Sequence, residues 1–195
     1  MNVQFEYEKM YSVNNFERID LFKCISKTNN IQTVLYLGSS IHISPSFVFK
    51  NVTYIDKSDC ANEFFKCKED IIDYINSRKI YNQTPYISFI NVNYNTDMKL
   101  IYQKYDLVIS INSYNSFESS IKYIRKDGIL LFLPLPQESK VSRKNEHIKY
   151  IGKIIFKGNK YRYVKDEEIV NKKSIKNKNI VFQENNEYEV YKKET

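Results

Sequence analysis

Short apolar runs alternate with stretches of helical spacing along the first two-thirds of the chain. Runs such as TVLYLG and GILLFLP are apolar at nearly every position, which is typical of strands buried on both faces of a parallel sheet. Between these runs, apolar residues recur at steps of three and four, as they do along one side of a helix. The pattern predicts strands at 33–38, 52–56, 86–91, 106–111 and 128–134, and helices at 13–28, 58–78, 96–105 and 115–126.

Short local signals refine the ends of these elements. Ser44 followed by Pro45 is typical of a helix start, but the next strand begins so soon that we expect this crossover to be mostly loop. Asn115 with Glu118 three positions later resembles a capping box. Gly128 is placed to end the preceding helix in a left-handed conformation, because glycine adopts that conformation without strain.

The alternation of strands and helices predicts the fold class. It indicates βαβ units with right-handed crossovers, and therefore an α/β, Rossmann-like three-layer sandwich whose mostly parallel sheet has helices on both faces. After residue 135 the pattern changes to strand-like segments at 150–158, 161–164 and 187–193, separated by charged stretches. We expect these to be antiparallel strands at the C-terminal edge, with lysines protecting that edge. Without a linker or repeat, one domain over 1–195 is predicted, with a core at about 14–135.

The amino-acid composition restricts the class of protein and its expected location. The chain has 195 residues, of which 42% are hydrophobic and 27% charged, which is enough to bury a core. It has no apolar window of 18 residues and begins with a polar, acidic stretch, so we expect a soluble, cytoplasmic protein without a membrane partner. Its three cysteines, Cys24, Cys60 and Cys67, and two histidines do not make an obvious metal set. We expect free thiols, with Cys60 and Cys67 as small buried side chains on one helix face.

The net charge of +7 leaves two interpretations open. Lysines that neutralise phosphates release counterions and bind nucleic acid without regard to its sequence. The same excess is also compatible with a solvated surface, because Lys, Ile, Asn and Tyr are abundant throughout the chain. The densest basic stretch, KKSIKNKNI at 172–180, contains no aromatic residue that could stack on a base.

Candidate chemistry gathers where the predicted strands end. Because the carboxyl ends of parallel strands share one edge of a sheet, Gly38, Asp56, Asn91–Asn93 and Asn112 should lie on one rim. Gly38 permits a tight turn close to a ligand, and the residues that follow it, Ser39 and Ser40, add hydroxyl and N–H donors. Asp56, 18 residues after Gly38, is placed to accept the hydroxyl protons of a ribose. Its alternative role is an N-cap for the helix that follows.

The glycine pattern restricts the cofactor. A dinucleotide fingerprint G-x-G-x-x-G would need glycines at 40 and 43, where the chain has Ser40 and Ile43. No helix begins soon enough after Gly38 to hold a pyrophosphate. A cofactor with a ribose and no phosphate fits better, and S-adenosylmethionine is the common one.

The ordered segments LYLGSS, VTYID, FINVNY, YDLVIS and YIRKDGILLF resemble those of class I S-adenosylmethionine-dependent methyltransferases, over about residues 14–135. The resemblance implies that Gly38 and Ser39 lie beside the methionine part of the cofactor, Asp56 on its ribose and Asn93 near its adenine. The chain is also similar to a group of small bacterial proteins that carry this fold with a Y-x-G-S...H-x-x-P-S-F...V-x-Y-x-D signature. The segment VTYID and the loop before it, with His42, match that signature.

Methyl transfer demands few catalytic residues, because the cofactor carries the reactivity and the protein mainly aligns donor and acceptor. His42 is the candidate base because an unperturbed imidazole titrates near neutrality. Its alternative role is to hydrogen-bond the loop backbone and fix its shape. Tyr114 is a candidate to stack on or bound an acceptor, next to Asn112.

Three classes of function therefore stay open. The first is a methyltransferase acting on an unidentified acceptor. The second is a catalytically degenerate fold that serves as a binding or scaffold protein, which the single glycine of the loop and the missing N-P-P-Y type motif favour. The third is nucleic-acid binding through the basic surface.

Overall fold

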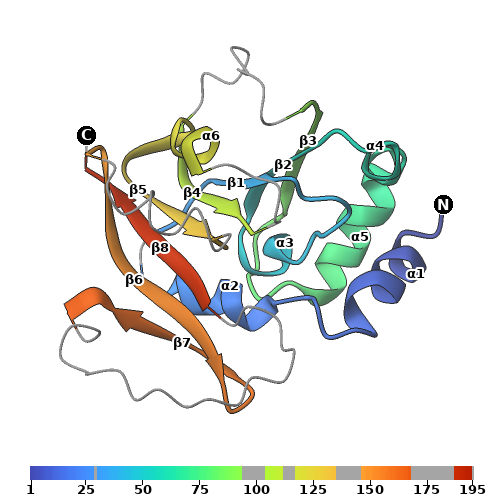
Figure 1. Cartoon of the computed structure of the whole chain (residues 1–195). Helices are drawn as coiled ribbons and strands as arrows, with labels where there is room; N and C mark the ends of the chain where they lie inside the picture. The colour runs from blue at the N-terminus through green and yellow to red at the C-terminus, as the bar shows by residue number, and fades with distance from the viewer. Residues whose placement is uncertain (29, 94–103, 112–116, 135–145, 168–186, 195) are drawn as a thin grey trace.

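The computed structural model describes residues 1–28, 30–93, 104–111, 117–134, 146–167 and 187–194. They form an eight-stranded sheet in the order β3-β2-β1-β4-β5-β8-β6-β7 (Figure 1). The first five strands in this order pair in parallel, and the last three join them in antiparallel pairs. The strands are β1 (Val34–Leu37), β2 (Asn51–Asp56), β3 (Tyr86–Asn91), β4 (Tyr105–Ser110), β5 (Ile124–Phe132), β6 (Ile148–Lys157), β7 (Lys160–Lys165) and β8 (Glu187–Lys193).

Helices cover both faces of this sheet. Buried side chains of α1 to α5 pack on one face, whereas Phe117 of α6 packs on the other. The predicted Rossmann-like α/β sandwich with an antiparallel C-terminal edge is confirmed. The helices are α1 (Val3–Tyr7), the π-helical turn η1 (Glu8–Ser12), α2 (Ile19–Ser26), α3 (Pro45–Val48), α4 (Asp59–Lys66), α5 (Lys68–Arg78) and α6 (Phe117–Ile121).

The central strands owe their position to their apolar runs. Every residue of β1 and β4 is buried, so these strands lie in the middle of the sheet with a core on each face. Leu35 and Leu37 face one core, and Val34 and Tyr36 face the other. Burial of each such leucine or valine side chain contributes about 1.5–3 kcal/mol relative to its exposure. A chain that alternated apolar and polar residues here would expose one face of the sheet.

Strand order also determines where a ligand can bind. The chain moves outward from β1 through β2 to β3, and then returns to the other side of β1 at β4. Connections therefore leave the neighbouring strands β1 and β4 in opposite directions, and open α/β sheets bind ligands beyond the carboxyl ends of such a pair. Gly38 follows β1 and Asp56 ends β2 at this carboxyl rim.

Two predicted helices differ from those observed. The helix expected over 13–28 begins only at Ile19, because Asn15 and Arg18 have positive φ angles of 57° and 54°. The helix expected over 58–78 is broken at Cys67, whose ψ of 52° is not helical. All three cysteines are free, but Cys60 is exposed, so the prediction that it is buried was wrong.

The turn into β5 also differs from its prediction. α6 ends at Ile121, and β5 begins at Ile124, so positions 127 and 128 lie within the strand. The left-handed residue there is Asp127, with φ 62°, rather than Gly128. Glycine is needed at 128 for space instead, because a Cβ there would lie 2.8 Å from the carbonyl oxygen of Tyr105. Asn115 and most of the helix expected at 96–105 lie outside the described residues.

The N-terminal segment formed by α1 and η1 was not predicted. The side chain of Asn2 caps α1 by accepting a hydrogen bond from the backbone N–H of Phe5, at 3.0 Å. The segment buries Val3 and Tyr7 against α3 and α5 and leaves Phe5 exposed. Within the described parts of the chain, no helix has both the length and the apolar character needed to cross a membrane.

Candidate cofactor site at the carboxyl rim

The loop after β1 folds back onto the end of β2. Gly38 has a φ of 64°, which reverses the chain, and its N–H donates to the carbonyl of Ile55 at 2.8 Å. The N–H of Ser39 donates to the same carbonyl at 3.1 Å. One residue further, the N–H of Ser40 donates to Oδ2 of Asp56 at 2.8 Å. The loop that follows the turn at position 38 and the carboxylate at position 56 are therefore in contact.

Asp56 holds two backbone groups together without being a helix cap. Its Oδ1 accepts the N–H of Ser58 at 2.8 Å, while Oδ2 accepts the N–H of Ser40. The cap of α4 is Ser58, whose hydroxyl accepts the N–H of Ala61 at 3.3 Å. Asp56 is partly exposed, and a carboxylate has about four acceptor positions, so two of them remain for other donors.

The remaining predicted cofactor residues follow β3 and β4. Asn93 lies just past the end of β3, which pairs in register with β2 so that Asn91 is the neighbour of Asp56. Asn112 and Tyr114, the two residues expected after β4, lie outside the described residues. The structure therefore brings Gly38, Ser39, Ser40 and Asp56 together and places Asn93 one strand away.

Ser110 is a rim residue that the sequence analysis did not single out. It ends β4, is 1% exposed, and its hydroxyl has no hydrogen-bond partner among the described residues. An unpaired buried hydroxyl costs free energy, and such groups commonly serve a ligand or an ordered water. The sequence signal that could have identified Ser110 is its position as the polar residue at the end of the apolar run of β4.

His42 lies inside the protein rather than at its surface. It is 1% exposed, and its Nδ1 lies 2.9 Å from the hydroxyl of Tyr36. Its Nε2 lies 3.1 Å from the carbonyl of Glu17, which can only accept, so Nε2 carries the proton and Nδ1 accepts from Tyr36. Burial, followed by the charge of Arg18, lowers the pKa of His42 to about 3. This arrangement favours the role of fixing the loop over that of a base.

A buried polar network extends from His42 to α5. The hydroxyl of Ser44 lies 2.9 Å from Nε2 of His42 and also contacts the hydroxyl of Tyr7. Ser44 is thus used here rather than as the expected helix cap, for which it makes no bond. Beside it, Arg78 donates through both terminal nitrogens to Glu17, at 2.5 and 3.1 Å. This bidentate pair anchors the connection between η1 and α2 against α5.

Tyr11 of η1 covers the loop of the rim. Its ring centroid lies 4.5 Å from that of His42, with the planes tilted by 31°. Burial raises the pKa of Tyr11, and its hydroxyl lies close enough to the Ser40 side chain for hydrogen bonding to lower it in part. Sequence reasoning missed Tyr11, because one tyrosine among 17 in an acidic, polar start gives no signal.

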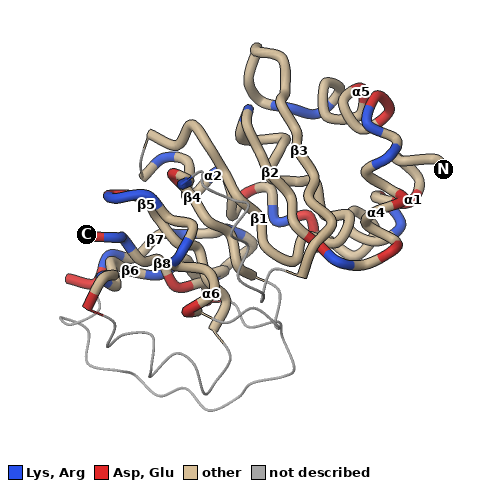
Figure 2. The backbone as a smooth tube through the Cα atoms, turned by 90° about the horizontal axis from the view of Figure 1, so that it is seen from above, with Lys and Arg blue, Asp and Glu red and all other residues tan. Residues whose placement is uncertain are grey.

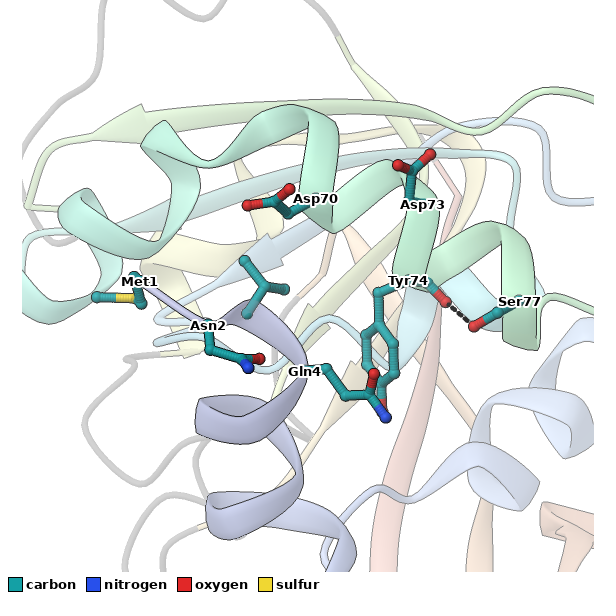
Figure 3. Close-up of a pocket in the computed structure, with 8 residues that line it drawn as sticks. Met1, Asn2, Gln4, Asp70, Asp73, Tyr74 and Ser77 are labelled. Atoms are coloured by element: carbon teal, nitrogen blue, oxygen red, sulfur yellow. Dashed lines mark hydrogen bonds between the residues drawn. The ribbon is translucent and has the colours of Figure 1, made fainter.

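Three cavities in the described parts of the chain are lined by other segments. The one in Figure 3, of about 530 Å³, lies between α1 and α5, where Tyr74 extends from α5 towards Gln4. A second, of about 660 Å³, lies between residues 14–23 and the β6–β7 hairpin. A third, of about 310 Å³, lies between α4 and β3. None of these three cavities is lined by Gly38, Ser40 or Asp56.

Comparison with solved structures gives the fold. The chain is similar to the N-methyltransferase NodS from Bradyrhizobium japonicum WM9, with a TM-score of 0.52 and 11% identity over 92% of this chain and 96% of that one. It is similar to a methyltransferase from Geobacter sulfurreducens, with a TM-score of 0.54 and 10% identity over 98% and 89% of the two chains. An rRNA methylase from Streptococcus thermophilus gives a TM-score of 0.51 and 7% identity over 89% and 93%.

No family model and no curated protein matches the sequence. At these low identities the likeness to solved structures concerns the fold alone. The fold is that of class I methyltransferases, with the Gly38 turn and the Asp56 carboxylate at the carboxyl rim of its sheet.

Proposed function

We propose that the protein is an S-adenosylmethionine-dependent methyltransferase. The observation that carries the proposal is the hydrogen bond from the Ser40 N–H to Asp56 in a chain with a methyltransferase fold. It joins the turn after β1 and the acidic end of β2 at the point where strand order reverses, which is where such sheets bind ligands. The similarity to the small bacterial group that shares the Y-x-G-S signature belongs to the same proposal.

The described residues fit such a cofactor. The two acceptor positions left on the Asp56 carboxylate suit the two hydroxyls of a ribose. Gly38 and Ser39 would adjoin the methionine part and Asn93 the adenine, in line with the family resemblance. The unpaired hydroxyl of Ser110, at the end of the neighbouring strand, is a further donor for this site.

The cofactor would supply an activated methyl group, so the chain's own residues need only align the acceptor and accept its proton. His42 is held neutral with both ring nitrogens engaged, and it serves the site by fixing the loop. Tyr114 stays the residue proposed to face the acceptor, and Asn112 stays a proposed cofactor-binding residue. A cytoplasmic location is part of this proposal, and the three free cysteines suit a reducing compartment.

Direct binding tests the proposal. Isothermal titration of the full chain with S-adenosylmethionine and S-adenosylhomocysteine should give saturable binding, and ligand at about 100 times its Kd should add roughly 2.7 kcal/mol to the free energy of unfolding. Asp56→Asn should abolish the binding, while the matched control Asp73→Asn, an exposed aspartate on α5, should keep it. Equal affinity of the two variants, or no binding by the wild type, would overturn the proposal.

A second candidate is a degenerate methyltransferase fold that acts as a binding protein. The position of Tyr11 favours it, because the ring packs on His42 and its hydroxyl approaches Ser40, on the rim where a cofactor would lie. Tyr11→Ala separates the two candidates. If neither the wild type nor this variant binds S-adenosylmethionine while both remain folded, the second candidate is supported. Binding by the variant alone would show that Tyr11 obstructs a competent site.

A further inference from the structure

Lysines gather at the edge of the sheet opposite the carboxyl rim. The amino ends of β4, β5 and β6 meet the carboxyl end of β8 there, because β8 runs antiparallel to both β5 and β6. Figure 2 shows the blue segments of β5 and β8 beside the C-terminus. We call this surface the basic edge and define it as Lys104, Lys122, Lys126, Lys149, Lys192 and Lys193.

Contacts show that these lysines are neighbours. Nζ of Lys104 donates to the carbonyl of Lys122. Burial, and then the charge of Lys104, lowers the pKa of Lys193. Lys149 lies directly opposite Lys192 in the ladder between β6 and β8. Like charges at directly opposed positions destabilise an antiparallel pair, so the fold holds repelling cations together.

Nearby carboxylates compensate this charge only in part. Lys192 pairs with Asp127 at 2.7 Å, and Arg125, next to Lys126, pairs with the buried Asp106. Two exposed glutamates, Glu146 and Glu194, also border the edge. They lie near each other because the N–H of Glu194 donates to the carbonyl of His147, the residue after Glu146. The six lysines and Arg125 outnumber these four carboxylates, so the edge keeps a positive charge.

We propose that the basic edge binds the phosphate backbone of a nucleic acid. Four of its lysines, Lys104, Lys122, Lys126 and Lys149, are exposed, and phosphates would relieve the repulsion between Lys149 and Lys192. An anionic membrane would also attract lysines, but membrane-binding surfaces add apolar side chains. The large exposed apolar residues of the described chain lie instead near the N-terminus, at Ile80 and at Tyr86, away from this edge.

The proposal does not depend on methyl transfer, because the basic edge and the carboxyl rim lie at opposite ends of the strands. The basic stretch at 172–180, which first suggested nucleic acid, lies outside the described residues. The basic edge instead places an excess of positive charge on described residues.

A charge-matched pair of variants tests the proposal. One replaces Lys104, Lys122, Lys149 and Lys193 by Gln, and the control replaces four exposed lysines on the other side of the molecule, Lys9, Lys57, Lys66 and Lys68, by Gln. Both lose the same net charge, and neither touches Arg125 or Lys192, whose ion pairs support the fold. Circular dichroism and thermal unfolding establish that both variants are folded.

Binding is measured by fluorescence anisotropy with a short labelled duplex, as DNA and as RNA, between about 50 and 200 mM salt. The wild type should bind one or both duplexes with an affinity that falls with salt, and the control should match it. The basic-edge variant should lose at least about tenfold in affinity, and its log–log salt slope should fall by about one for each lysine that contacts a phosphate. Equal losses in the two variants, or no binding by the wild type, would contradict the proposal. So would association with phosphatidylserine vesicles in place of either duplex.

Discussion

Two aspartates bind the backbone at opposite ends of the central strand β1. They differ in how many of their acceptor positions the protein itself occupies. Asp106, at the amino end, is 8% exposed and uses Oδ2 to accept the N–H groups of Gln32 and Thr33 and the Thr33 hydroxyl, at 2.9, 2.7 and 3.0 Å. Its Oδ1 contacts Arg125. Asp56, at the carboxyl end, is partly exposed and accepts one backbone N–H on each oxygen.

This difference distinguishes a carboxylate that only stabilises the fold from one that can also bind a ligand. Asp106 has its acceptor positions filled by its own chain, so it stabilises the join between β1, β4 and β5 and has nothing left for a ligand. Asp56 orders its loop with half of its acceptors and faces the rim with the rest. The resemblance to methyltransferases includes both aspartates, and only the contacts show their different roles.

Removing Asp106 should give the largest effect. Asp106→Asn leaves Arg125 and two backbone N–H groups without their charged acceptor, and we expect a loss of about 3 kcal/mol in the free energy of unfolding, measured by urea titration. Burial raises the pKa of Asp106, but the N–H groups of Gln32 and Thr33 lower it more, so it stays below the ordinary value. Its stabilisation is present above about pH 4 and is lost as the pH falls further, and the variant should lack this acid-dependent part.

His42 should make the rim sensitive to acid at a higher pH. Burial lowers the pKa of His42 to about 3, whereas an unfolded histidine titrates near pH 6.5. The unfolded chain therefore binds an extra proton between these values, and stability should fall by about 1.4 kcal/mol for each pH unit below about 6.

In His42→Gln, the free energy of unfolding should depend less on pH below about 6, with a slope lower than that of the wild type by about 1.4 kcal/mol per pH unit. The control His147→Gln changes an exposed residue and should keep the wild-type slope. If the two variants share one slope, His42 is not the titrating group.

Asp56→Asn should affect stability less than Asp106→Asn does. Its amide keeps one acceptor oxygen for one of the two N–H groups, so we expect a loss of about 1 kcal/mol by the same urea titration. Binding of S-adenosylmethionine should nevertheless disappear, because the ribose loses its charged acceptor. A stability loss as large as that of Asp106→Asn would remove the contrast between the two aspartates.

Asp127 should give the smallest effect. It is an exposed residue near the start of β5 and pairs with Lys192 at 2.7 Å, a surface pair that water and salt screen. Asp127→Asn should leave the urea midpoint unchanged within error. The same variant should strengthen binding of the labelled duplex, since it removes a negative charge from the basic edge. Weaker duplex binding by this variant would argue against that surface.

The sequence by itself determined much of the sheet. Apolar runs predicted the parallel strand at 86–91 with the observed ends, and the other parallel strands within a few residues. The strand-like segment EYEVYKK predicted the edge strand at 187–193 with the observed ends. These runs are local, because a residue buried on both faces must be apolar whatever lies across from it. The position of Gly38 and Asp56 after neighbouring parallel strands was predictable for the same reason, since strand ends share a rim.

The tertiary structure alone decided what surrounds these residues. Glycine is required at 128 because a Cβ there would meet Tyr105 of β4, which belongs to a different segment. His42 is buried and neutral because it contacts Tyr36, Glu17 and Tyr11, which come from separate parts of the chain. Periodicity reports which face of an element is buried, whereas burial of charge and free acceptor capacity depend on partners far apart in the chain. For that reason the sequence could propose Asp56 as a ligand for ribose, but only the folded chain could show which of its acceptor positions remain free.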